Sequence, residues 1–281
     1  MRLVNLGCGS RFHPDWINID IDPSSPEVMA HDLSKGIPLE SNSCDAVYHS
    51  HVLEHIRRND ALQFMKECHR VLKPGGVLRV AVPDLERICR LYVEKLDGAL
   101  AGESSAGDDY NWIMLEMYDQ TVREKSGGAM GSYLRTSPLP NKEFIYERIG
   151  TSGRMMVESM NAPRPDPSND TKAAQKPAGR RSRSALRKMR DMFLKAVLSR
   201  EEQRALDIGR FRLAGELHQW MYDRYSLGRL MKEVGFADPG VQTATGSMIQ
   251  GWKDFHLDTL PDGSVIKPDS LFMEAVKPGR S

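Results

Sequence analysis

The sequence has few cysteines, and its N-terminal region has no long apolar run. The chain of 281 residues contains four cysteines, and no two of them form a C-x-x-C motif. This scatter argues against a disulfide framework and against a zinc ribbon, so we expect no structural metal. The first apolar run, Leu3 to Leu6, is interrupted by Asn5 and followed by Gly7. We therefore expect no signal peptide and no membrane span, which predicts a cytoplasmic protein.

The chain also lacks an excess of either charge. Its 39 Lys and Arg residues against 38 Asp and Glu residues leave a formal net charge of +1, which excludes a global electrostatic grip on nucleic acid or membrane. One local basic run, from Arg180 to Lys195, contains a single acidic residue, Asp191. A solvated helix face is the preferred interpretation of this run, and contact with RNA or anionic lipid is the alternative.

The first part of the chain, residues 1–97, has the pattern of a parallel sheet with crossover connections. Short apolar runs alternate there with turn residues, as in α/β proteins. We predict a helix from Asp60 to Leu72, capped by Asn59 and ended by the Pro74 to Gly76 turn. The predicted strands are Arg2–Leu6, Ile17–Ile21, Val28–Ala30, Ala46–Ser50 and Val77–Val82.

Residues 98–213 show no strand alternation and are predicted to form a mostly helical insertion. Within it, residues 161–184 are rich in Pro, Asp, Ser and basic residues with almost no large apolar residue, so we predict disorder there. Order returns over residues 214–281, with a helix over Leu227–Val234 and strands over Val241–Ala244 and Ser270–Val276. These elements are expected to complete the sheet begun in the first part.

A glycine turn and an acidic strand end suggest a nucleoside site. The apolar run Leu3–Leu6 enters the turn Gly7-Cys8-Gly9, where the backbone can bend sharply and approach a ligand. The next apolar run ends at Asp20, whose carboxylate can accept both hydroxyls of a ribose. Phe12 stands where a dinucleotide motif requires a third glycine, so a pyrophosphate site is poorly supported. The pattern favours a nucleoside without phosphates, such as S-adenosylmethionine.

Five segments in order resemble the class I S-adenosylmethionine-dependent methyltransferases, in particular their small-molecule and sugar-type branch. They read L-V-N-L-G-C-G-S, W-I-N-I-D, H-D-L, C-D-A-V-Y-H-S-H-V-L-E-H and R-V-L-K-P-G-G-V-L-R-V-A-V-P-D. The resemblance covers about residues 1–90 and resumes near Tyr225 to Phe236. It implies a Rossmann-like, doubly wound α/β fold with a mostly parallel seven-stranded sheet, whose last strand is antiparallel, and an insertion before the C-terminal strands.

The resemblance also implies a cofactor site for S-adenosylmethionine. Asp20 would hold the ribose, and Asp32 and Leu33 would flank the adenine. The residues that would surround the methionine part of the cofactor are Asn5, Gly7, Cys8, Gly9, Ser50 and His51. The sequence departs from the family at Asn5, where an acidic residue is usual, and at Arg11, where a third glycine is usual. The first crossover helix is reduced to the loop Ser10 to Asp15, which predicts that Arg11, Phe12 and His13 form part of a lid.

A group of histidines follows the fourth predicted strand. His51 to His55 spells H-x-x-E-H, the inverted zinc-peptidase motif, but that motif must lie within a helix. Because His51 is expected at a strand-to-helix turn, we predict no metal at this motif. As general base for methyl transfer we predict His55 or His218, with Asp84 as another candidate that can equally cap the following helix.

The predicted function is S-adenosylmethionine-dependent methyl transfer to a small molecule or saccharide, most simply to an oxygen. A non-catalytic S-adenosylmethionine-binding module is the alternative, motivated by Asn5, Arg11 and the missing helix. Nucleic-acid methylation is a third and less favoured hypothesis, since it rests on the basic run alone. Several Met and aromatic residues could line an apolar acceptor pocket or simply pack in the core: Met155, Met156, Met160, Trp220, Met221, Tyr222 and Tyr225.

Overall fold

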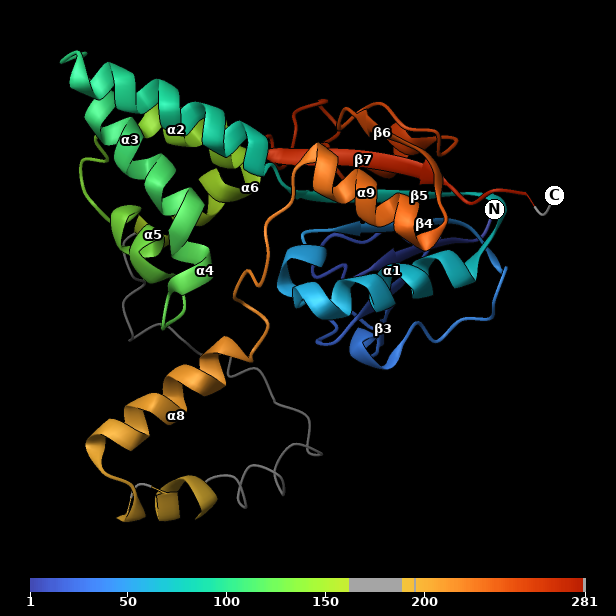
Figure 1. Ribbon diagram of the computed structural model, residues 1–281, viewed down its shortest axis with the longest axis horizontal. Coiled ribbons are helices and arrows are strands. Elements are labelled where there is room, and N and C mark those ends of the chain that lie inside the picture. Colours follow the sequence, from blue (N-terminus) through green and yellow to red (C-terminus); the bar gives the residue numbers. More distant parts are fainter. Residues whose placement is uncertain (162–188, 195, 280–281) are drawn as a thin grey trace, which may run out of the picture.

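A seven-stranded sheet forms the centre of the computed structural model, which describes residues 1–161, 189–194 and 196–279. The strand order is β3-β2-β1-β4-β5-β7-β6 (Figure 1). The strands are β1 (Leu3–Leu6), β2 (Trp16–Asp20), β3 (Val28–Ala30), β4 (Cys44–Ser50), β5 (Leu72–Pro83), β6 (Ala237–Gln242) and β7 (Ser270–Val276). All five N-terminal strands are mutually parallel, and β7 is antiparallel to both β5 and β6. The predicted Rossmann-like fold is confirmed.

The order of the strands reverses at β1. The chain moves outward from β1 to β2 and β3, then returns to place β4 on the other side of β1. In open α/β sheets, a crevice for ligands lies outside the carboxyl ends of the strands at such a point. Residues that directly follow β1, β2 and β4 therefore meet at one edge of the sheet.

Two helices, α1 (Arg58–Val71) and α9 (Arg224–Val234), pack side by side on one face of the sheet (Figure 1). Their buried side chains, such as Met65 and Met231, join the main core with those of the strands. The predicted cap at Asn59 was wrong: the helix begins two residues earlier, with Arg57 at the N-cap position and the Asp60 N–H donating to the Arg57 carbonyl at 2.8 Å. The predicted turn at residues 74–76 instead lies inside β5, where the Gly75 N–H bonds the carbonyl of Lys277.

The opposite face of the sheet is covered by the connection between β6 and β7. The first crossover has no helix, as predicted, and Trp16 and Tyr48 pack instead against Trp252 of this connection, with ring centroids 6.1 and 5.1 Å away. Arg79 of β5 holds the connection in place. Its guanidinium is fully buried, forms ion pairs of 2.8 Å with Asp258 and Glu274, and lies over the Trp252 ring.

The insertion is helical and has its own core. It comprises α2 (Leu85–Leu100), α3 (Ala106–Met114), a π-helical turn (Leu115–Asp119), α4 (Gln120–Val122), α5 (Gly128–Tyr133), α6 (Lys142–Asn161) and α8 (Arg200–Arg212). Trp112, Ile113 and Ile145 are completely buried among these helices, apart from the core of the sheet. The predicted domain boundary between residues 97 and 98 falls inside α2. Asp84 caps this helix by accepting the Arg87 N–H. Disorder was predicted for residues 161–184, and all of these except residue 161 lie outside the described residues.

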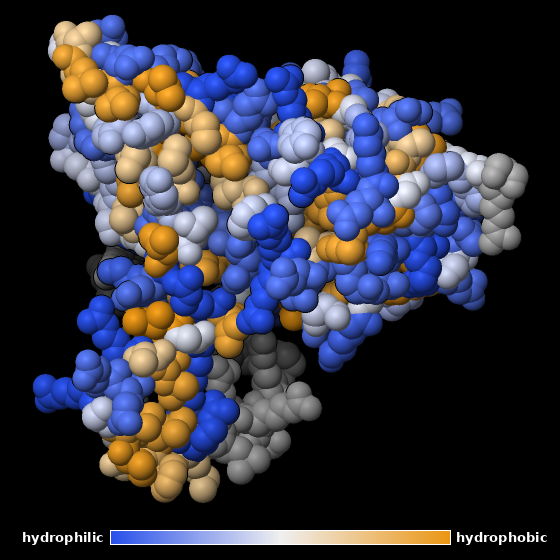
Figure 2. Space-filling view, viewed as in Figure 1, coloured by the Kyte–Doolittle hydropathy of each residue, from blue (hydrophilic) through white to orange (hydrophobic). Residues whose placement is uncertain are grey.

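Exposed apolar side chains gather near α8, at the lower left of Figure 2. They include Met189, Met192 and Phe193, which belong to the described part of the basic run; residues 180–188 and 195 lie outside the described residues. In the part of the chain that the structure describes, no helix is long and apolar enough to cross a membrane.

Replacing Arg79 by Met is expected to lower the free energy of unfolding by about 3–5 kcal/mol, because it leaves Asp258 and Glu274 buried without their cation. Chemical denaturation measures this change. The control is Arg90→Met, which removes an ion pair with Glu86 from a largely exposed arginine and should cost no more than about 1 kcal/mol. Equal midpoints for the two variants would contradict the role given to Arg79.

Candidate functional site

Two cavities open at the carboxyl edge of the sheet, and they share Gly7 and His51. The larger has a volume of about 1000 Å³ and extends over the ends of β2 and β3, where it is lined by Asp20, Asp32 and Leu33. The smaller, about 480 Å³, lies on the other side of the glycine turn and is lined by Asn5, Cys8, Gly9, Ser10, Arg11 and Ser50 among others. The predicted cofactor residues thus line two neighbouring cavities, with Gly7 and His51 at the boundary between them.

The junction of the two cavities is made by backbone in the left-handed region. Gly7 has φ 63°, and a Cβ built on it would lie 2.4 Å from Cγ2 of Val52. His51 has φ 55°, a conformation that side chains other than glycine adopt rarely, and its N–H donates to the Ala81 carbonyl at 2.8 Å. Backbone outliers of this kind cluster at functional sites, because the surrounding structure must hold them in place.

Asp20 is joined directly to the glycine turn. One carboxylate oxygen accepts the Gly9 N–H at 2.8 Å and the other accepts the Asp22 N–H at 2.9 Å. Gly9 has φ 53°, and a Cβ on it would meet only open space. The carboxylate is therefore fixed beside the turn, with Asp20 lining the larger cavity and Gly9 the smaller.

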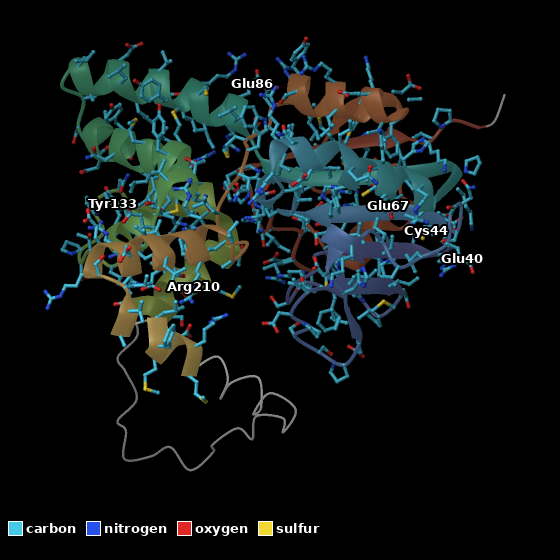
Figure 3. The ribbon with its side chains drawn as sticks, turned by 60° about the horizontal axis from the view of Figure 1, so that its bottom comes forward. Glu40, Cys44, Glu67, Glu86, Tyr133 and Arg210 are labelled. Atoms are coloured by element: carbon cyan, nitrogen blue, oxygen red, sulfur yellow. The ribbon has the colours of Figure 1, made fainter. Side chains whose placement is uncertain are left out.

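The far wall of the larger cavity is a loop held by α1. Asp32 accepts the N–H and hydroxyl of Ser34, and these hydrogen bonds lower the pKa of the Asp32 carboxyl. Glu67, labelled in Figure 3, reaches from α1 to accept the Ile37 N–H at 3.0 Å, and Arg70 bonds the Ile37 carbonyl. Asp32 and Leu33 therefore stand on a fixed segment.

The smaller cavity shows how the sequence departs from the family pattern. The Asn5 amide donates to the carbonyl of Arg11 at 2.9 Å, which ties the end of β1 to the following loop. Burial, with a smaller contribution from Asp20, raises the pKa of the Cys8 thiol to about 11, so it stays protonated. The predicted lid is wrong in part: the His13 ring packs against Phe255 with centroids 5.1 Å apart, and its carbonyl accepts from the Asn18 amide.

Other residues of the smaller cavity were missed by sequence reasoning. They are Tyr48, Leu257, Asp258, Ile266, Lys267 and Phe272. Most belong to the connection between β6 and β7, which no motif associated with a site. Gly150 bends α6 at φ 62°, and a Cβ there would lie 2.6 Å from the Ile266 carbonyl, so a glycine is needed where the insertion meets this wall.

Among the apolar residues proposed for an acceptor pocket, only Met155 lines one of these cavities. Tyr222 is buried in the core of the sheet, Met221 packs on the insertion core, and Tyr225 is exposed. Trp220 stacks under the guanidinium of Arg58, 4.4 Å from the ring centroid. The side chains of Met156 and Met160 lie outside the described residues.

The histidines form a cluster around Glu54. The turn Leu53–His55 is a short 3-10 helix, so the H-x-x-E-H motif does not lie in an α-helix, as predicted. Glu54 is completely buried, with His51 Nδ1 3.2 Å and His55 Nε2 3.9 Å from its Oε1 atom. His218 lies in the irregular segment before α9, and its ring centroid is 4.9 Å from that of His55.

Burial and charge set the protonation of this cluster. Burial alone would raise the pKa of Glu54, but the neighbouring imidazoles lower it to about 2, so the carboxylate is charged at neutral pH. Burial lowers the pKa of His218 to about 3. A base is most effective with a pKa near the working pH, which His218 does not have. Of the two predicted catalytic histidines, His55 is the one that lines a cavity.

Comparison with known proteins agrees with this geometry. A family model described as a methyltransferase domain matches residues 5–80, from β1 to β5. A probable S-adenosylmethionine-dependent methyltransferase of Mycolicibacterium smegmatis is 32% identical over 99 residues, which cover 29% of this chain and 38% of that protein. The chain therefore matches well under half of that relative's length. Residues 5–80 are thus similar to a methyltransferase domain, and the partial relative is described as one that depends on S-adenosylmethionine.

Solved structures that align with most of the chain show low similarity. The complex of the Haloferax volcanii Trm112 methyltransferase activator with a putative methyltransferase gives a TM-score of 0.38 at 10% identity, covering 99% of this chain and 83% of that one. A Thermotoga maritima S-adenosylmethionine-dependent methyltransferase, described as a possible histamine N-methyltransferase, gives 0.36 at 12% identity, covering 98% and 82%.

His49, at the end of β4, is expected to make stability depend on pH. Its ring is fully buried against Phe64, and burial lowers its pKa from 6.5 to about 4. The unfolded chain takes up this proton near pH 6.5 while the folded chain does not, so the free energy of unfolding falls between pH 6.5 and 4, by roughly 3 kcal/mol for this residue. Denaturation of His49→Leu across this range should show a shallower pH dependence than the wild type.

The matched control for this measurement is His256→Asn, at an exposed position with φ 50° that asparagine tolerates. It should keep the wild-type slope of stability against pH. A His49→Leu variant with the same slope as the control would show that His49 takes up its proton equally in both states.

Proposed function

We propose that this protein transfers a methyl group from S-adenosylmethionine to an oxygen of a small polar molecule or saccharide. The observation that carries the proposal is the junction of two cavities at Gly7 and His51. One cavity has acidic groups suited to an adenosyl moiety, and the other has polar groups suited to an amino acid and an acceptor. A ligand that crosses the junction would present its central atoms at the carboxyl edge of the sheet.

The residues on both sides of the junction fit the cofactor. Asp20 retains unused lone pairs for ribose hydroxyls, and Leu33 offers an apolar surface for a base. The open space at Gly9 leaves room for the ligand against bare backbone. When bound, the cofactor supplies an activated methyl on a sulfonium. The task of the protein is then to hold an acceptor atom about 3 Å from that methyl and to keep it aligned.

The composition of the smaller cavity supports a polar acceptor. Its walls carry the Ser50 hydroxyl, the Asp258 carboxylate and the Lys267 ammonium, whose pKa is lowered by burial. Hydroxyl groups of a saccharide can be recognised by such donors and acceptors, and the single thioether of Met155 supplies contact from the insertion. His55, at the edge of the larger cavity, is placed to take a proton from an acceptor hydroxyl.

The test of the proposed function is release of S-adenosylhomocysteine from S-adenosylmethionine with a panel of sugars, nucleotide sugars and hydroxylated small molecules. We expect turnover with at least one hydroxylated acceptor and methylation at its oxygen, identified by mass spectrometry and NMR. Tight binding of the cofactor without turnover on any acceptor would favour the non-catalytic module instead. Turnover confined to RNA or DNA would contradict the proposed acceptor class.

Replacing Asp20 by Asn is expected to weaken binding of S-adenosylhomocysteine by about 10–100-fold, because charge-assisted hydrogen bonds to the ribose are lost and the amide can accept only one of the Gly9 and Asp22 N–H groups. Isothermal titration calorimetry measures the dissociation constant. Glu27→Gln removes an exposed carboxylate from the loop that follows β2 and is the matched control, with unchanged affinity expected. Unchanged affinity in Asp20→Asn would contradict the assignment of the larger cavity to the adenosyl group.

A further inference from the structure

Three potential metal ligands from distant parts of the sequence converge beside the cavity junction. Glu54 and His55 belong to the turn after β4, and His218 belongs to the segment between α8 and α9. One ligand atom of each lies within 4.8 Å of the other two. The backbone holds this arrangement from both sides: the Gln219 N–H donates to the Glu54 carbonyl at 2.6 Å, and the His218 N–H donates to the Gln120 carbonyl at 2.9 Å.

Three buried polar atoms of this cluster form no hydrogen bond that meets strict geometry. Neither carboxylate oxygen of Glu54 has one, although the side chain is 0% exposed, and the buried Nδ1 of His218 has none either. His51 Nδ1, 3.2 Å from Glu54 Oε1, is the nearest charged partner, and it leaves Oε2 and the His218 Nδ1 atom unsatisfied. Buried polar groups in proteins are almost always satisfied, and a buried charge is paired or coordinates a metal. A cation among these atoms would satisfy them together.

The orientation of His55 is that of a metal ligand. Its Nδ1 atom lies 3.1 Å from the Leu217 carbonyl, an acceptor, so Nδ1 carries the proton. In the neutral ring this tautomer leaves the lone pair on Nε2, which faces Glu54 Oε1 at 3.9 Å. Histidine ligands commonly donate the other ring N–H to a backbone carbonyl, which fixes the tautomer and the ring plane.

We propose that Glu54, His55 and His218 bind one divalent transition-metal ion, such as Zn²⁺ or Mn²⁺. Two imidazoles and one carboxylate form a donor set that suits these ions better than Mg²⁺, which prefers oxygen ligands. An ion about 2.1 Å from each ligand holds the ligand atoms no more than about 4 Å apart, so the cluster closes by about an ångström on binding. His55, whose side chain is 27% exposed, has room to make this movement.

This site is distinct from the inverted zinc-peptidase arrangement that the H-x-x-E-H letters suggest. There, both histidines of the motif bind zinc and the glutamate acts as a base on one helix. Here Glu54 is itself a ligand, the turn is a 3-10 helix, and the third ligand comes from His218, about 160 residues further along the chain. Sequence reasoning excluded a metal because it examined the motif without this distant residue.

The position of the ion gives it a use in methyl transfer, and this part of the inference rests on the proposed function. Of the three ligands, His55 lines the larger cavity, so a fourth coordination position of the ion would be reached from there. With His55 bound to the ion it is no longer the base, and a hydroxyl bound to the ion would instead lose its proton to water at lower pH than a free alcohol does. The oxygen then forms a bond to the methyl carbon while the carbon–sulfur bond breaks, and the sulfur keeps that electron pair as S-adenosylhomocysteine.

Metal binding is tested on the full chain after dialysis against a chelator. Titration calorimetry with Zn²⁺ and with Mn²⁺, together with metal analysis of the re-dialysed protein, should show one equivalent bound, while Mg²⁺ at the same concentration does not compete. A Co²⁺-loaded sample should give visible absorption bands of a low-coordinate site. Failure of Zn²⁺, Mn²⁺ and Co²⁺ alike to bind stoichiometrically would overturn the proposal without recourse to any variant.

Variants then locate the site. Glu54→Gln and His218→Asn should each weaken Zn²⁺ binding by more than about 100-fold, beyond the 10–100-fold effect of outer-sphere partners. The controls are Glu233→Gln and His256→Asn, both exposed, which should bind Zn²⁺ as the wild type does. Circular dichroism confirms that each variant is folded. Wild-type Zn²⁺ affinity in both cluster variants would overturn the assignment.

Titration with S-adenosylhomocysteine separates this inference from the proposed function. Cofactor binding by a chain that takes up no metal would overturn the metal site and leave methyl transfer standing. Stoichiometric metal binding by a chain that does not bind the cofactor would support the site and contradict the proposed function.

Discussion

The turn between β1 and its following loop is the constraint on which the site depends. Gly7 must adopt a positive φ and must lack a Cβ, because Val52 after β4 occupies the space that a side chain would need. His51, on the adjacent strand end, is held in the same unusual region. Since parallel strands end at the same edge, these two strained residues become neighbours, and they form the boundary that both cavities share.

The connection between β6 and β7 supports this edge of the sheet in place of a first crossover helix. Where a crossover helix is expected after β1, the chain places only a short loop, and the connection between β6 and β7 covers the exposed side of the sheet instead. Buried Arg79 joins that connection to β5 and β7 through two carboxylates. The same connection supplies Asp258 and Lys267 to the smaller cavity. Fold stability and the acceptor wall are therefore linked through one segment.

Local sequence signals predicted the sheet well and selected residues that line the two cavities at its carboxyl edge, because strands, glycine turns and strand-end carboxylates are encoded by adjacent residues. Asp20 beside Gly9 is an example. Contacts between distant segments carry no such signal. The wall formed by residues 257–272, the bend at Gly150 and the approach of His218 to Glu54 depend on tertiary packing, so sequence reasoning missed them. Local signals also failed at the start of α1. Asn59 is a residue type that often caps helices, but the N-cap of this helix is Arg57.

The central claim is that one ligand spans both cavities across the Gly7 and His51 junction. Calorimetric titration with S-adenosylhomocysteine and with 5′-methylthioadenosine tests it directly, because the second compound has the adenosyl part but not the amino acid part. We expect one binding site for each compound. S-adenosylhomocysteine should bind at least about tenfold more tightly than 5′-methylthioadenosine, a difference of about 1.4 kcal/mol. Equal affinities, or no heat of binding for either compound, would contradict it.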